Sequence, residues 1–282
     1  MTPPPATPQV EFRRELNRPD GQVNLARAAL LIACEAYPQL HVNAYLTRLD
    51  QLAEEVRDRL ADESAPLVLL EEMGRTLYER HGFRGNREEY YDPRNSFLSD
   101  VLDRRTGIPL TLGIVYLEVG WRLGLPLEGV NFPGHFLVRF AGEEVRLLVD
   151  PFDEGRVRFE DEAQTLLDRG YGGLIRVRPE FLKAAGRRAM LVRLLTNLKG
   201  VYLGQEDYPR ALAVVDHIPS IHPMAPGELR TRGTLLARMG RADEALQELE
   251  RYLDCTPGGP DVARIRALVE ELRGAGREKE ER

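Results

Sequence analysis

The stretch 107–151 constrains the fold of this chain more than any other part of the sequence. An apolar segment begins there at Pro109, and Pro is favoured in the first turn of a helix because its missing N–H has no helical partner at that position. The segment ends before a Leu-Gly-Leu-Pro sequence at 123–126. Two runs rich in β-branched and aromatic residues, 135–140 and 145–150, follow it. The sequence therefore predicts a buried helix followed by an antiparallel hairpin.

A two-residue turn at Gly142-Glu143 would set the register of this hairpin, because Gly supplies the positive φ that a type II′ turn requires. Counting outward from that turn predicts four opposed pairs: Phe140–Val145, Val138–Leu147, Phe136–Val149 and His135–Asp150. Opposed residues have Cβ atoms about 5 Å apart, so His135 and Asp150 should meet on one face. The same register sets Arg139 opposite Arg146, a pairing of like charges that is unfavourable unless both side chains reach solvent or an acidic residue. A β-bulge in either strand would change this register.

The region before the hairpin has a helical pattern from Asn24 to about Gly82. Apolar residues at helical spacing predict a first helix that ends before Pro38, a second that Asn43 can cap, and a third that follows Ser64. A loop over 83–95 and a helix over about 96–105 then lead to Pro109.

The region after Ala189 is predicted to be helical and repetitive. Three positions of a pattern recur 34 residues later: Tyr208, Ala211 and Pro223 correspond to Ala242, Ala245 and Pro257. A period of this length with small residues at the helix crossing is typical of tetratricopeptide (TPR) repeats. Arg232 stands where Leu198 stands one period earlier, so the second unit is imperfect. The segment from Val262 to Leu272 is predicted to cap the array.

Composition excludes several classes of function. The net charge of −6 gives no basic footprint for nucleic acid, and the longest mainly apolar run, 108–117, is too short to span a membrane. The two cysteines suit a reducing compartment, and no basic segment precedes an apolar run at the start. The histidines lack metal-ligand spacing. We therefore expect a cytoplasmic protein without metal, cofactor, nucleic-acid partner or membrane association.

The order of helix, His-bearing strand and Asp-bearing strand resembles the core of transglutaminase-like, papain-type cysteine hydrolases. Three motifs extend the resemblance to a bacterial family named as regulators of sirC expression: the stretches 90–98 (YYDPRNSFL), 104–109 (RRTGIP) and 134–139 (GHFLVR). Members of that family join a helical start, a transglutaminase-like core and TPR repeats. The resemblance implies an α+β fold with a helical N-terminal region, a core with antiparallel strands and C-terminal helical hairpins.

The predicted domain boundaries follow from this organisation. We expect a disordered arm over residues 1–20, a helical plus transglutaminase-like domain over 21–180, a TPR-like helical domain over 189–273, and a disordered tail over 274–282.

In the transglutaminase-like fold a Cys begins the central helix, a His follows on a strand, and an Asp on the next strand orients the His. His135 and Asp150 match the last two roles, but Pro109 falls at the Cys position. Thr111 is the only hydroxyl side chain nearby, and a catalytic Thr usually depends on its own terminal amine. Cys34 has the spacing of a buried mid-helix residue, and Cys255 ends a helix, where the dipole opposes a thiolate.

These observations leave three functional hypotheses. The first is a non-catalytic scaffold that binds a protein or peptide partner and could have a regulatory role, with Arg193, Asn197 and Arg230 as candidate partner-binding residues. The second is a residual hydrolase or amide-processing enzyme that uses His135 and Asp150, with Thr111 as a residual candidate. The third is a purely structural core whose TPR helices alone make contacts.

Overall fold

The structure is a computed structural model that describes residues 6–60, 65–142, 146–222 and 226–280. The chain divides into two compact units, one through Leu194 and one from Leu195. The boundary falls within α8 (Arg187–Gly204), slightly later than the sequence predicted. Each unit is described by itself.

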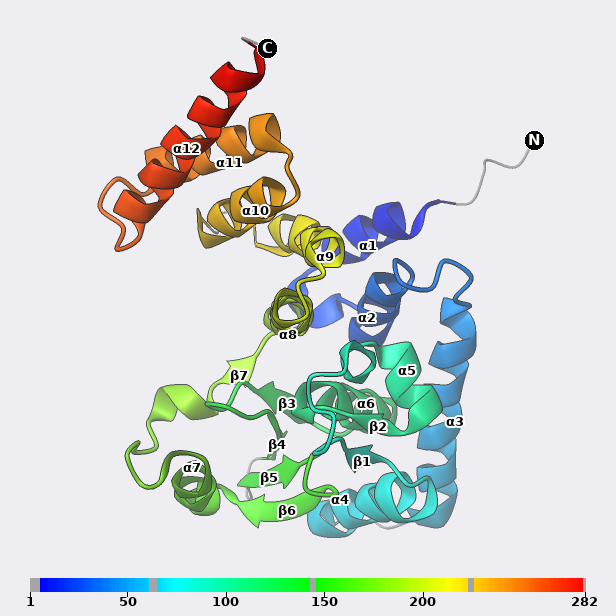
Figure 1. Ribbon diagram of the computed structural model, residues 1–282. Coiled ribbons are helices and arrows are strands. Elements are labelled where there is room, and N and C mark those ends of the chain that lie inside the picture. The colour runs from blue at the N-terminus through cyan, green and yellow to red at the C-terminus, as the bar shows by residue number, and fades with distance from the viewer. Residues whose placement is uncertain (1–5, 61–64, 143–145, 223–225, 281–282) are drawn as a thin grey trace, which may run out of the picture. The chain divides into compact units, whose positions relative to one another are not determined.

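In the N-terminal unit, α1 to α6 precede the strands of the main sheet along the chain, and α7 lies between the last two of those strands (Figure 1). Its helices are α1 (Pro8–Leu16), α2 (Leu25–Ala33), α3 (Val42–Leu60), α4 (Pro66–Gly74), the π-helical turn η2 (Arg75–Arg80), α5 (Leu98–Arg104), α6 (Pro109–Arg122) and α7 (Ala163–Tyr171). Short 3₁₀ turns lie at η1 (Asp20–Gln22), η3 (Pro93–Asn95), η4 (Glu160–Glu162) and η5 (Pro179–Leu182).

The main sheet has the antiparallel strand order β6-β5-β4-β3-β7. Its strands are β3 (Leu127–Val130), β4 (Leu137–Ala141), β5 (Arg146–Asp150), β6 (Arg156–Phe159) and β7 (Ala184–Ala185). A separate parallel pair joins β1 (Arg84–Gly85) to β2 (Thr106–Gly107), immediately before α6. The α+β class and the antiparallel core predicted from the sequence are confirmed.

Helices cover both faces of the sheet. On one face Leu137 and Leu148 pack with Leu167 of α7 in a buried cluster. On the other face α6 approaches closely because glycines leave room: a Cβ at Gly113 would lie 2.4 Å from the Phe136 ring, and one at Gly120 would lie 2.1 Å from Leu127. The close packing explains why α6 is buried over most of its length, as the sequence predicted.

The C-terminal unit consists of antiparallel helices, in keeping with the predicted repeats. After the end of α8 come α9 (Tyr208–Ile221), α10 (Pro226–Arg238), α11 (Ala242–Cys255) and α12 (Val262–Glu280). Ala211 and Ala245, the recurring small residues, are fully buried. A Cβ at Gly233 would lie 2.6 Å from Leu249, so Gly233 permits α10 and α11 to cross closely. Arg232 forms ion pairs with Asp216 and Glu248, which explains how a charged side chain is accommodated in this repeat.

Several local predictions were wrong. Residues 8–16 form α1 rather than part of a disordered arm, because Phe12 and Leu16 bury an apolar face. α3 begins at Val42, so Asn43 lies inside the helix, where its Oδ1 accepts a hydrogen bond from Arg27. α12 continues to Glu280 through most of the predicted tail. The predicted capping position Ser64, the turn residue Glu143 and the repeat residue Pro223 lie outside the described residues.

Candidate functional site

His135 and Asp150 meet as predicted. His135 lies in the turn before β4 and Asp150 is the last residue of β5, and 2.8 Å separates Nε2 of the imidazole from Oδ1 of the carboxylate. The predicted contact is confirmed, but the strand position of His135 is wrong because β4 begins only at Leu137.

The register of the hairpin also differs from the prediction. Val138 faces Val149, two positions beyond the predicted Leu147. A shift by two residues leaves every side chain on its predicted face, because side chains alternate with a period of two. The described pairing runs as far as Ala141 and Arg146, and residues 143–145 of the connection lie outside the described residues. Arg139 now faces Leu148, and its guanidinium pairs with Glu128, which removes the predicted Arg–Arg conflict.

Asp150 is 5% exposed and its Oδ1 atom accepts three hydrogen bonds. The donors are His135 Nε2 and the backbone N–H groups of Phe152 (3.0 Å) and Asp153 (3.2 Å). Burial alone would raise the pKa of Asp150, but the hydrogen bond and charge of His135, together with the two backbone N–H groups, outweigh it and lower the pKa. Asp150 is therefore a carboxylate held in its ionised form beside the imidazole.

The His135 ring is held in place by its backbone and its neighbours. Its backbone carbonyl accepts a 2.7 Å hydrogen bond from Arg193, and its ring meets Phe152 edge to face with centroids 6.1 Å apart. The preceding Gly134 has φ +66°, and a Cβ there would lie 2.8 Å from the Tyr171 hydroxyl, so this turn requires glycine. Since Nε2 is bound to Asp150, Nδ1 is the second imidazole nitrogen, and no hydrogen bond from a described residue reaches it.

The pair lines a pocket of about 510 Å³. The pocket wall is formed mostly by aromatic and apolar residues, with arginines among them: Arg87, Phe132, Pro133, Gly134, Phe152, Asp153, Leu166, Arg169, Gly170 and Tyr171. Arg87 lies over the Phe152 ring at 4.9 Å and 3.7 Å from Asp153. None of these described lining residues carries a thiol or an aliphatic hydroxyl.

The start of α6 carries no thiol, and its one side-chain hydroxyl, that of Thr111, is buried and hydrogen-bonded. α6 begins at Pro109, which confirms the predicted helix start. Thr111 is fully buried, and its Oγ1 accepts from the Ile108 N–H and lies 2.7 Å from the Asn95 carbonyl, to which it donates. The hydroxyl of Thr111 therefore caps the helix and joins it to the preceding loop.

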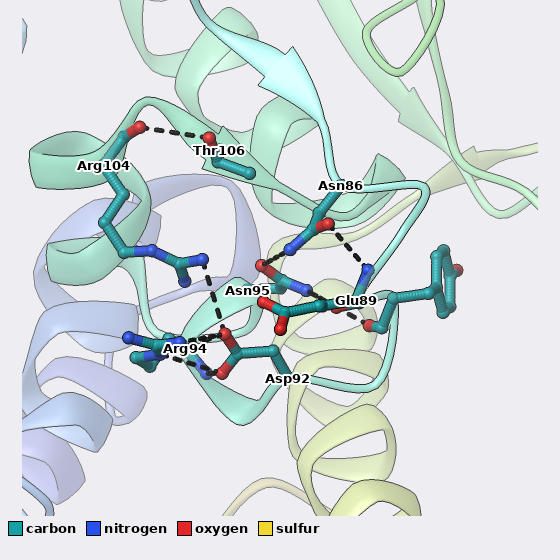
Figure 2. Close-up of polar contacts among 8 residues, drawn as sticks. Asn86, Glu89, Asp92, Arg94, Asn95, Arg104 and Thr106 are labelled. Atoms are coloured by element: carbon teal, nitrogen blue, oxygen red, sulfur yellow. Dashed lines mark hydrogen bonds and ion pairs between the residues drawn. The ribbon is translucent and has the colours of Figure 1, made fainter.

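That preceding loop is fixed by a polar network (Figure 2). The Asn86 side chain donates to Asn95 Oδ1 at 3.1 Å, and Asn95 Nδ2 donates to the Glu89 carbonyl at 2.7 Å. Asp92 is paired with Arg94 and Arg104 at 2.8 and 3.4 Å. The motif at 90–98 thus serves to shape the loop that carries Tyr90 and Arg87 beside Phe152.

Neither cysteine is among the described residues that line the His135 pocket. Cys34 is the C-cap of α2 rather than a mid-helix residue, because the helix ends at Ala33. It is buried, and burial, followed by the charge of Glu11, raises the pKa of its thiol. Cys255 is the last residue of α11, as predicted, and it is exposed.

Two of the three candidate partner-binding residues have partners within their own unit. Arg193 binds Asn131 as well as the His135 carbonyl, and burial lowers the pKa of its guanidinium. Its link to the His135 turn was missed by sequence reasoning, because 58 residues separate the two. Arg230 pairs with Asp261. Asn197 is half-buried on α8.

Within the part of the chain that the structure describes, no group of three His, Cys, Asp or Glu side chains could hold a metal ion. None of the described helices is both long and apolar enough to cross a membrane.

Fold and site together define a transglutaminase-like core followed by TPR hairpins. Sequence comparison agrees: the transglutaminase-like superfamily matches residues 43–196, more than half of the chain, and the tetratricopeptide repeat matches residues 198–270. A UPF0162 protein from Xylella fastidiosa strain Temecula1 is 37% identical over 256 residues, covering 90% of this chain and 91% of its own length. A UPF0162 protein from Pseudomonas aeruginosa strain PAO1 is 31% identical over 248 residues, covering 88% and 90%. The chain therefore belongs to the UPF0162 family within the transglutaminase-like superfamily.

A shorter similarity links part of the chain to a eukaryotic protein. F-box only protein 21 from Homo sapiens is 44% identical over 85 residues, which are 30% of this chain and 14% of that protein.

Proposed function

We propose that this protein is a non-catalytic transglutaminase-like scaffold whose pocket around His135 and Asp150 binds a peptide segment of a protein partner. The observation that carries the proposal is an intact His–Asp pair in a pocket whose described lining residues carry no thiol, in a core whose α6 helix begins with Pro109. A papain-type nucleophile needs a thiolate at an electropositive helix start that also supplies backbone donors. Pro109 supplies neither the thiol nor an N–H.

The shape of the pocket favours a peptide. Apolar rings from Phe132, Phe152 and Tyr171 offer surface for a side chain, while Arg87 and Arg169 offer hydrogen-bond donors. Pockets of this volume with a few polar groups on an apolar wall are typical of ligand sites. The TPR hairpins add a second surface suited to helical or extended segments, on which we retain Asn197 and Arg230 as candidate contacts, with Arg193 supporting the pocket.

The family resemblance leads us to extend the proposal to regulation. A protein that binds a partner without turning it over can act on gene expression, including that of sirC, through that partner. We also propose that the protein acts in the cytoplasm and does not contact nucleic acid itself, since its net charge is −6.

A fluorescent peptide panel tests the proposal. Saturable binding by fluorescence anisotropy, without any cleaved or cross-linked product by mass spectrometry, is the expected result. Leu166→Trp, which fills the pocket, should abolish binding, and His135→Ala should weaken it. His222→Ala is the matched control, because His222 is exposed and lies in the other unit. Binding that survives Leu166→Trp would contradict the proposed pocket.

A residual hydrolase is the second candidate, and the environment of His135 favours it. An imidazole oriented by a buried carboxylate, with Nδ1 directed away from that carboxylate, has the arrangement of a general base that could activate water. In that case turnover of an amide substrate should be lost in both His135→Ala and Asp150→Asn, and should persist when both cysteines are replaced.

A further inference from the structure

A second pocket, of about 520 Å³, lies between α3, α5 and the segment that joins α2 to α3. Tyr37, Leu40 and Ala44 form its apolar side, and Tyr45, Arg48 and Asp103 form its polar side. Among the described residues it shares no lining residue with the His135 pocket. Nothing in the transglutaminase-like chemistry described above accounts for it.

Two residues that line this pocket, Ser99 and Asp100, each have a buried oxygen atom without a partner. Ser99 is 2% exposed, and its Oγ has no hydrogen-bond partner among the described residues. Asp100 Oδ2, on the next residue of α5, is likewise buried and unpartnered, although the same carboxylate accepts a hydrogen bond from Tyr37. Buried oxygens without partners are uncommon in folded proteins and call for a donor.

The charges that line the pocket do not balance. Asp103 is satisfied by Arg48 and by the Tyr45 hydroxyl at 2.7 Å. Asp100 forms no ion pair with a described residue: Arg104, one turn along α5, pairs with Asp92 through Nη2 at 3.4 Å, and its buried Nη1 has no partner. With histidine counted as neutral, the lining, which includes His41, holds two carboxylates and one guanidinium.

The electrostatics of the lining agree with this shortage. Burial raises the pKa of Asp100, and the Tyr37 hydrogen bond and the Arg104 charge offset it only in part. Burial and the hydrogen bond to Asp103 raise the pKa of Tyr45 to about 12, so this phenol stays neutral. A ligand with one positive charge and several hydrogen-bond donors would balance the charge of the lining and would also supply partners for the two buried oxygen atoms.

We propose that this pocket binds a primary ammonium group carried on an apolar chain. The ammonium donates to Asp100 Oδ2 and Ser99 Oγ, and the chain packs on Leu40 and Ala44. Because both oxygens have almost no accessible surface, the ligand displaces the Tyr37 side chain, which is 36% exposed, and replaces it as the partner of Asp100. A compact ammonium with three donors fits two neighbouring oxygens, and an aromatic wall adds cation–π attraction.

Calorimetric titration of the full chain with hexylammonium chloride tests the proposal. We expect saturable binding that is at least tenfold tighter than that of 1-hexanol, which has the chain without the charge. Hexanoate should not bind. Equal affinity for hexylammonium and hexanol would overturn the proposal, because it would reduce the pocket to an apolar cavity.

Variants assign the binding to this pocket. Asp100→Asn should weaken hexylammonium binding at least tenfold and Ser99→Ala severalfold, whereas Asp58→Asn, at an exposed carboxylate of α3, should leave it unchanged. Ala44→Trp fills the pocket from an exposed position and should abolish binding even if Asp100→Asn does not fold. Unchanged affinity in Ala44→Trp would contradict the site.

The ammonium could come from a free amine or from a lysine side chain, and Nα-acetyl-lysine methylamide separates the two. Affinity equal to that of hexylammonium points to a lysine side chain of a peptide. Affinity at least tenfold weaker points to a free amine. Both results support the ammonium site.

Discussion

Replacing Asp150 with Ala should destabilise the N-terminal unit by about 3.5 to 4 kcal/mol. The change removes a charged acceptor from His135, a loss of roughly 1.5 to 2 kcal/mol, and leaves the N–H groups of Phe152 and Asp153 without a partner, at about 1 kcal/mol each because they are only partly buried. Asp150→Asn keeps an acceptor for the two N–H groups, so we expect a loss of only about 1 to 2 kcal/mol.

Urea unfolding followed by fluorescence measures this loss in the correct unit. The chain has one tryptophan, Trp121, which lies in α6 and donates to the Leu127 carbonyl, so its emission reports the N-terminal unit. Asp161→Ala is the matched control: Asp161 is an exposed carboxylate in η4 of the same unit, so its loss should cost about 0.5 kcal/mol or less. Equal destabilisation by Asp150→Ala and Asp161→Ala would refute the reasoning.

The same comparison has a defined pH dependence. Because the pKa of Asp150 is lower in the folded than in the unfolded chain, its stabilisation is fully present above the unfolded value of about 4 and is lost as the pH falls through the folded value. The difference between the wild type and Asp150→Asn should therefore be constant near neutrality and should shrink below about pH 4. A difference that grows on acidification would contradict the lowered pKa.

Three further predictions concern other parts of the chain. Thr111→Val should lower the free energy of unfolding in urea by about 1 to 3 kcal/mol, because the Ile108 N–H and the Asn95 carbonyl each lose a hydrogen-bond partner. It should have no effect on any turnover. An unchanged urea midpoint would refute the capping role of Thr111. Iodoacetamide should alkylate exposed Cys255 much faster than buried Cys34, as peptide mass spectrometry would report, and equal rates would contradict the raised pKa and burial of Cys34. Gly233→Ala should destabilise the C-terminal unit by about 1 to 3 kcal/mol through overpacking, measured by circular dichroism, and an unchanged melting curve would contradict the close helix crossing.

The sequence was sufficient to predict the fold and the central pair because both depend on local signals. Pro109 marked the start of α6, the 34-residue recurrence marked the helical hairpins, and the parity of the two strands put His135 and Asp150 on one face. That parity survives a register error of two residues, which is why the contact was predicted correctly although the register was not.

The remaining features depend on contacts between residues distant in the sequence. Nothing local links Arg193 to the His135 carbonyl, Thr111 to Asn95, or Asp100 to Tyr37. α1 was missed because its helical face is stabilised by burial of Phe12 and Leu16 rather than by strong propensity. Each of these contacts, and the formation of α1, depends on tertiary packing, which no single segment of the sequence determines.

The most direct test of the central claim measures binding and chemistry in one experiment. The full chain and the Cys34→Ser/Cys255→Ser double variant are incubated with the same peptide and amide panel, with anisotropy and product mass recorded together. We expect equal saturable binding by both proteins, loss of binding in Leu166→Trp, and no cleaved or cross-linked product. Product formed by the wild type and abolished in the double variant would contradict it, because a cysteine would then be acting as the nucleophile.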